Sequence, residues 1–152
     1  ERKGIELNLF WEISDNLVFD FSAAKSEGNF KGLPSGKDSI TDAHEEVIGT
    51  GLTYINPNGI KASLRVRHFS DAVLTEDESV TKDGSTLIHT GVSYSFDNWE
   101  LGIDILNLMD REDDDIAYFF ESRLPGEVDP LEDIHFHPSN PRSVRVLLKY
   151  NF

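Results

Sequence analysis

The end of the chain alternates without interruption between two sets of residues. From Val144 onward, one set is Val144, Val146, Leu148, Tyr150 and Phe152, and the other is Arg145, Leu147, Lys149 and Asn151. A period of two is the geometry of a β-strand, whose successive side chains point to opposite faces. The apolar set ends in two aromatic residues, as the closing strand of a transmembrane β-barrel would need. This stretch therefore predicts a strand with one apolar face.

The same alternation recurs in six earlier segments, each bounded by turn residues. We expect strands at residues 5–12, 17–24, 46–55, 60–67, 86–96 and 99–106. Turn signals such as Asn56-Pro57-Asn58-Gly59 separate some of them directly. The sequence thus predicts an all-β protein, an antiparallel meander of about seven strands.

The connections between these strands alternate strictly between short and long. The short ones are 14–16, 56–59 and 97–98, and the long ones are 25–44, 70–83 and 108–140. Outer-membrane barrels have short periplasmic turns and longer extracellular loops. This order of lengths indicates such a barrel, with the three long loops at the cell surface.

Aromatic residues gather near the short turns. Trp11, Tyr54, Tyr94, Phe96 and Trp99, joined by Tyr150 and Phe152 at the end of the chain, can all share the apolar face. Aromatic rings are favoured at membrane interfaces, so these residues predict a girdle at the periplasmic boundary. A soluble β-sandwich also alternates and is the main alternative fold. It explains neither the one-sided loops nor the one-sided aromatic residues.

The opposite face carries many charges, which would be costly in a dry core and are ordinary in a wet lumen. The net charge of −14 also argues against nucleic acid as a partner. With a mean hydropathy of −0.37 and no long apolar run, the chain has no segment for a helical membrane span. It has no cysteine, which excludes disulfides and thiolate metal sites. Residues 109–140 hold ten acidic residues against two arginines, for which a solvated loop surface is the ordinary interpretation.

An odd number of strands would put the two chain ends on opposite sides of the membrane, whereas bacterial single-chain barrels generally have even counts. An open sheet would also leave the edge of the first strand unpaired in lipid, which bilayers do not tolerate. The sequence starts in a strand pattern, without an initiator Met or a signal peptide. We therefore expect residues 1–152 to be the C-terminal part of a larger barrel.

Three stretches resemble the C-terminal end of TonB-dependent outer-membrane receptors. They are L-N-L-M-D-R-E at 106–112, F-F-E-S-R-L-P-G-E at 119–127 and D-I-H-F-H-P-S-N-P-R-S-V-R at 133–145, and R-K-G-I-E-L at 2–7 resembles a barrel strand of the same family. Where the family commonly has a phenylalanine before the aspartate of the first motif, this chain has Met109.

The resemblance implies a barrel of about 22 strands closed by an N-terminal plug. Such receptors lie in the outer membrane and take up scarce nutrients, such as iron–siderophore or other metal chelates, with energy from the TonB complex. The expected partners are outer-membrane lipid and lipopolysaccharide, the rest of the barrel and its plug, TonB through that plug, and a small-molecule or metal-chelate ligand. Plug and TonB box lie outside this chain. An outer-membrane barrel that does not transport and a soluble β-sandwich binding module remain the alternative functions.

Candidate chemistry is sparse. His135 and His137 flank Phe136, so in an extended segment both imidazoles point the same way and could bind a transition metal; alternatively they pack the base of the loop. There is no nucleophile elbow, P-loop or dinucleotide fingerprint, so we expect neither an enzyme nor a cofactor. Leu148, Tyr150 and Phe152 resemble the terminal signal that the barrel-assembly machinery reads.

The last two strands also permit a prediction of register. If paired residue numbers add to a constant of 249, Trp99 lies opposite Tyr150, Glu100 opposite Lys149 and Asp104 opposite Arg145. A shift by one residue would turn charges toward lipid, at a cost of about 2 to 4 kcal/mol for an Arg or Lys near the midplane. A shift by two would separate both opposite-charge pairs, each worth about 0.2 to 1 kcal/mol.

Overall fold

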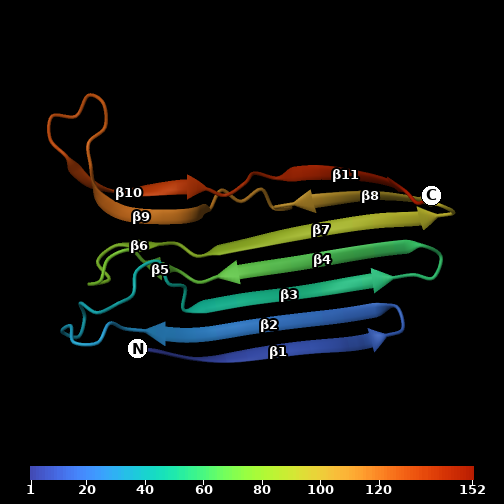
Figure 1. The fold of residues 1–152 in the computed structure, drawn as a ribbon, viewed down its shortest axis with the longest axis horizontal. Coiled ribbons are helices and arrows are strands. Elements are labelled where there is room, and N and C mark those ends of the chain that lie inside the picture. Colours follow the sequence, from blue (N-terminus) through green and yellow to red (C-terminus); the bar gives the residue numbers. More distant parts are fainter.

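The computed structural model describes residues 1–152 as one long antiparallel sheet with two small sheets at one end (Figure 1). The main sheet has seven strands in the order β1-β2-β3-β4-β7-β8-β11. Their bounds are β1 Arg2–Ser14, β2 Leu17–Gly28, β3 Glu46–Ile55, β4 Ile60–Phe69, β7 Ser85–Phe96, β8 Trp99–Leu106 and β11 Ser143–Tyr150. The structure contains no helix that could span a membrane.

The seven predicted strands are confirmed, and their order in the sheet is their order along the chain. β1 and β2 are longer than expected, because β1 begins at Arg2 and β2 continues to Gly28. The two chain ends lie at opposite ends of the sheet (Figure 1). β1 and β11 are the edges, each paired on one side only.

The sheet is a single layer. Only eight of the 152 residues are buried, and no second sheet covers either face of the main one. Apolar side chains such as Ile5, which is 74% exposed, stand free along one face. The two-layered sandwich that remained an alternative is therefore wrong, and the fold is a single-layered sheet with two uncovered faces.

The short turns are joined to one another by hydrogen bonds along their end of the sheet. Asn16 Nδ2 donates to the Ile55 carbonyl at 2.6 Å, and Asn151 N donates to the Asn98 carbonyl at 2.9 Å. Between them, Ser95 N donates to the carbonyl of Gly59 at 2.9 Å. Gly59 has a φ of +91°, and a Cβ there would collide with the Ser95 carbonyl, so only glycine fits this turn.

The register of the last strand pair is the predicted one. Trp99 pairs with Tyr150, Glu100 with Lys149 and Asp104 with Arg145. Neither of the two opposite-charge pairs closes to an ion pair. Asp104 leans the other way, since its carboxylate lies over Gly91 of β7, where no side chain opposes it.

The long loops contain structure that the sequence did not predict. The loop after β4 folds into a small hairpin of β5, Ala72–Val73, and β6, Thr81–Lys82. The loop after β8 forms a longer hairpin of β9, Asp114–Ser122, and β10, Leu131–Pro138, which projects beyond the main sheet (Figure 1). Most of the buried residues lie in these loops and at their bases, namely Ser39, Ala72, Leu74, Lys82, Asn107 and Ala117.

Candidate functional site

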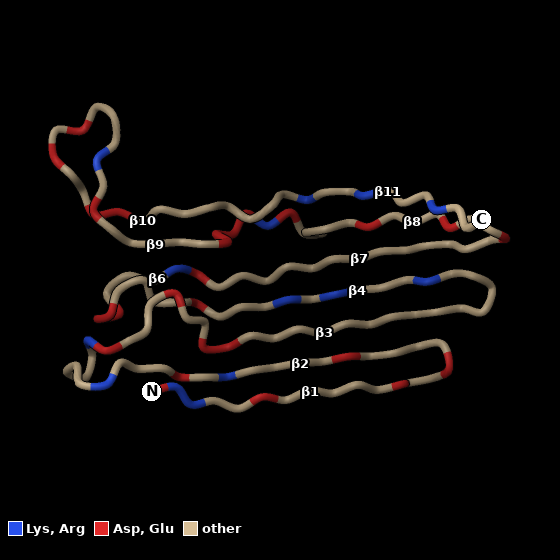
Figure 2. The backbone as a smooth tube through the Cα atoms, in the orientation of Figure 1, with Lys and Arg blue, Asp and Glu red and all other residues tan.

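The polar face of the sheet carries a strip of positive charge on β4. Lys61, Arg65 and Arg67 are all on this face, because each pairs with a polar-face residue of β7. Figure 2 shows their blue positions along β4, in contrast with the acidic positions that dominate the loop end. Two further cations, Arg145 and Lys149, lie on the same face of β11.

Arg65 reaches across a whole strand to find its partner. Its Nη1 lies 2.8 Å from Oδ2 and 2.9 Å from Oδ1 of Asp20 on β2. The intervening strand contributes Gly51, and a Cβ at that position would contact the guanidinium and the carboxylate. The absence of a side chain at Gly51 thus leaves the space through which Arg65 reaches Asp20. Since the Arg65 side chain remains 51% exposed, the pair is still accessible from the polar face of the sheet.

Next to this pair, Arg67 covers an aromatic ring. Its guanidinium carbon lies 5.2 Å from the ring centroid of Phe69, two residues further along the same face. A cation at this distance is attracted by the face of the ring. The polar face of β4 therefore offers guanidinium groups and one ring, groups that suit anionic or aromatic ligand chemistry.

The base of the longest loop is closed by the L-N-L-M-D motif. Asn107, 3% exposed, donates from Nδ2 to the carbonyls of Arg111 at 2.9 Å and Asn140 at 3.0 Å, which lie at the two ends of the loop. Its backbone N donates to Nδ1 of His89 at 3.1 Å. Asp110 Oδ1 accepts from the backbone N of Arg142 at 2.9 Å.

This role of the motif was not predicted. It became visible only in three dimensions, because the two ends of the loop are brought together by strand pairing. Met109, which stands where the family commonly has phenylalanine, is 63% exposed and takes no part in this closure.

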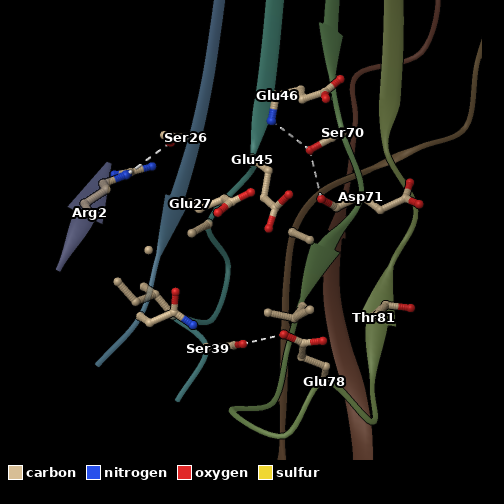
Figure 3. A pocket seen from close by; sticks show the side chains of 16 residues that line it. Arg2, Ser26, Glu27, Ser39, Glu45, Glu46, Ser70, Asp71, Glu78 and Thr81 are labelled. Atoms are coloured by element: carbon tan, nitrogen blue, oxygen red, sulfur yellow. Dashed lines mark hydrogen bonds between the residues drawn. The ribbon is translucent and has the colours of Figure 1, made fainter. Parts of the chain in front are cut away.

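A cavity of about 470 Å³ opens at the loop end of β2 and β3 (Figure 3). The charged residues of its lining are predominantly acidic, and Arg2 is the one cation among them. In Figure 3, Glu27 and Glu45 lie beside one another, and Ser39 Oγ donates to Glu78 Oε1 at 2.5 Å. The carboxylates of the lining come from Glu27, Glu45, Glu46, Asp71 and Glu78.

The predicted aromatic residues do share one face and one end of the sheet. Trp11 of β1, Tyr54 of β3, Tyr94 and Phe96 of β7 and Trp99 of β8 all lie on the apolar face near the short turns. The rings of Trp99 and Tyr150 are 4.6 Å apart, and Tyr150 meets Phe152 edge-on at 5.1 Å. This cluster includes two of the three residues assigned to the assembly signal, Leu148 being adjacent on β11. Its place at a membrane boundary stays a prediction.

His135 and His137 lie on one face of β10, as the sequence indicated. His135 stacks on Phe120 of β9, with ring centroids 4.0 Å apart, and its Nε2 is buried without a hydrogen-bond partner. His137, opposite Ile116, is exposed. The structure gathers no group of three or more metal-ligating side chains, here or elsewhere. Metal binding by this pair stays a prediction that would require His135 to leave Phe120.

The fold resembles solved receptor structures along nearly its whole length. The ferric yersiniabactin uptake receptor FyuA from Yersinia pestis matches 99% of this chain with a TM-score of 0.72 and 12% identity, over 23% of that protein. The ferric-catecholate import receptor Fiu from E. coli K12, in its closed form, matches 99% with a TM-score of 0.77 and 14% identity, over 21% of its length. The siderophore receptor PiuA from Acinetobacter baumannii matches 98% with a TM-score of 0.72 and 15% identity, over 21%.

These matches confirm the predicted fold. The chain has the fold of part of the barrel of TonB-dependent siderophore receptors and spans less than a quarter of their length. No protein-family model matches the sequence, and a comparison with curated proteins finds no match.

Proposed function

We propose that residues 1–152 form the C-terminal part of the barrel of an outer-membrane receptor that imports a ferric siderophore or a similar chelate. The observation that carries this proposal is the match of the whole chain to the barrel of a ferric-catecholate import receptor, with a TM-score of 0.77. The sheet has the properties such a wall needs, an apolar face, a charged face and long connections at one end only. The solved structures that it resembles are receptors and not enzymes.

The charged face supports a lumen that handles an anionic cargo. β4 presents three cations and no carboxylate, and Arg65 keeps about half of its side chain exposed. Catecholate complexes of ferric iron are anionic, and guanidinium groups recognise planar oxygen anions well. The same face would also contact a plug that fills the barrel.

The other surfaces suggest the remaining partners. The apolar face would contact outer-membrane lipid and, near the long loops, lipopolysaccharide. The free edges of β1 and β11 would pair with other strands of the barrel, because unpaired backbone groups are not tolerated in lipid. Energy would come from the TonB complex through the plug.

Uptake of radiolabelled iron in cells that carry or lack the gene tests this function. Iron is supplied as catecholate, hydroxamate and carboxylate chelates, each in a strain with TonB and in one without it. We expect uptake of at least one chelate to require both the gene and TonB. Equal uptake of all chelates with and without the gene would indicate a barrel that does not transport them.

A further inference from the structure

The three long loops contact one another around a buried lysine. Lys82 of β6 is 6% exposed, and its Nζ lies 3.0 Å from Oδ1 of Asp42, in the loop between β2 and β3. The same Nζ donates to the carbonyl of Asp115 at 3.5 Å, at the start of the β9–β10 hairpin. One ammonium group thus touches all three loops.

Other contacts join the first two loops at the same place. Asp42 N donates to the Val73 carbonyl at 2.8 Å, and Ser39 N donates to the Glu76 carbonyl at 3.2 Å. Figure 1 shows the loop after β2 rising to lie beside β5. These bonds pair backbone with backbone, so they tolerate many sequences. The contact through Lys82 depends on its side chain.

The third loop adds an apolar contact. Ala117 of β9 is fully buried, and it lines one small cavity together with Leu74, Thr41 and Asp42. Leu74 is 7% and Ala72 is 3% exposed, so all three buried apolar side chains of the chain, Ala72, Leu74 and Ala117, lie in the second and third loops. We call residues 39–43, 72–82 and 114–118 the loop unit.

We propose that the loop unit moves as one body, with Lys82 as the residue that couples its three parts. Lysine is almost never buried without a partner, because a desolvated ammonium is costly. If the loop that holds Asp42 or the hairpin that holds Asp115 moved outward, Lys82 would lose an acceptor while still buried against the rest. Separate movement of the three loops is therefore disfavoured.

Asp42→Asn is the sharpest variant for this proposal. Asp42 has a φ of +54°, a backbone conformation that Asn accepts readily, so the change removes the charge without adding strain. Asp83→Asn is the matched control, since Asp83 is exposed, lies next to Lys82 in sequence and forms no ion pair. Both variants are made in the full-length protein in outer-membrane vesicles.

The first readout is the rate at which an amine-acetylating reagent modifies Lys82, followed by mass spectrometry. We expect slow modification in the wild type and an increase of at least about tenfold in Asp42→Asn, because the buried ammonium then lacks its negatively charged partner. Lys31, whose side chain is 77% exposed, should react equally in all variants. Rapid modification of Lys82 in the wild type would overturn its buried position.

The second readout is hydrogen exchange of backbone amides. In Asp42→Asn, exchange should rise in all three parts of the loop unit at once and remain unchanged in β3 and β4. A rise confined to residues 72–82, or none at all, would show that Lys82 serves only its own loop and would overturn the proposal.

Lys82→Met gives a second comparison, and we expect a smaller rise in exchange, because the Asp42 carboxylate it leaves behind is 35% exposed and can be hydrated. An effect of Lys82→Met as large as that of Asp42→Asn would count against charge burial as the cause. Neither readout depends on transport, so the outcome is independent of the proposed function.

Discussion

Asn107 shows how much one polar residue can organise in a sheet with almost no core. It has a φ of +51°, which Asn tolerates better than most residues, and its side-chain amide holds both ends of a loop more than thirty residues long. In a buried position every such donor must find an acceptor. Asn107 meets this condition completely, which makes it sensitive to substitution.

We predict that Asn107→Asp loosens the base of this loop. Aspartate has the same size and also accepts a positive φ, but it loses both Nδ2 donors and places a carboxylate against two carbonyl oxygens. The loop base should lose about 1 to 3 kcal/mol of stability, the usual cost of unsatisfied buried polar groups. Hydrogen exchange of residues 108–140 measures it. Asn58→Asp, at an exposed turn position, is the control, and equal exchange in the two variants would contradict the role of Asn107.

Asp77 lies at the tip of the loop between β5 and β6, and hydrogen bonds hold its carboxylate in the ionised form. Donors from the hydroxyls of Ser79 and Thr75 and from the Ser79 backbone lower its pKa to about 2, from an ordinary value of 3.8. A lowered pKa stabilises the folded loop above about pH 4, and this contribution is lost as the pH falls toward 2.

Ser79→Ala should therefore raise the pKa of Asp77 toward its ordinary value. Ser79→Thr keeps the hydroxyl donor and should leave the pKa low. A carbon NMR titration of the Asp77 carboxyl in the full-length protein distinguishes the two variants. The same titration curve for the wild type and Ser79→Ala would mean that the hydroxyl is not responsible.

At the scale of the elements, the sequence predicted the seven strands and the register of the last pair, because each strand faces two different environments. It did not predict β5, β6, β9 and β10. β5 and β6 are two residues long and too short to show a period. β9 carries apolar residues on both faces, such as Ile116 and Ala117, since one face packs in the loop unit.

The alternation of polar and apolar residues also did not predict the ion pair between Arg65 and Asp20. Strand pairing places Arg65 opposite Gly51. The pairing alone does not show that the Arg65 side chain extends past Gly51 to Asp20 on β2. The same holds for Lys82, whose partners Asp42 and Asp115 lie in two other loops. Contacts between residues far apart in sequence need the actual geometry.

We predict that Gly51→Ala turns Arg65 away from Asp20 with little effect on stability. The added Cβ would collide with the guanidinium, but both partners are partly exposed, and such pairs contribute at most about 1 kcal/mol. Urea unfolding of the folded barrel measures the stability, and a crystal structure of the variant shows the rotamer of Arg65. Gly49→Ala, beside a serine hydroxyl on the same face, is the control. A loss well above that of the control would mean that Asp20 and Arg65 stabilise the sheet.

At the scale of the whole molecule, the two ends of the sheet differ in the length of their connections and in the kinds of side chains they carry. One end has short turns joined by hydrogen bonds and an aromatic cluster. The other has long acidic loops that pack on one another (Figure 2). Short turns at one end and long loops at the other are typical of outer-membrane barrels.

An epitope inserted at Gly126 should be labelled on intact cells. Gly126 lies in the connection between β9 and β10, with no other atom close to the position of a Cβ, so the insertion disturbs little. The same epitope between Asp97 and Asn98 should be labelled only after the outer membrane is permeabilised. The reverse result would invert the orientation of the sheet.

Deleting Phe152 should reduce the amount of barrel in the membrane more than it reduces the stability of assembled barrels. Phe152 is fully exposed and contacts Tyr150 only at its edge, so it adds little to the folded sheet. Its expected role is recognition by the assembly machinery. Immunoblots of outer-membrane fractions measure the amount, and normal levels of the deletion variant would contradict this role.

The hydrogen bond between Asn107 and His89 also determines which tautomer the His89 ring adopts. Because His89 Nδ1 accepts a hydrogen bond from the Asn107 backbone N–H, it carries no hydrogen of its own, and in the neutral ring the hydrogen must reside on Nε2. The residue that carries this N–H group pairs with Arg65 on the polar face. A group that forms a hydrogen bond with this N–H must therefore supply a lone pair and not a hydrogen.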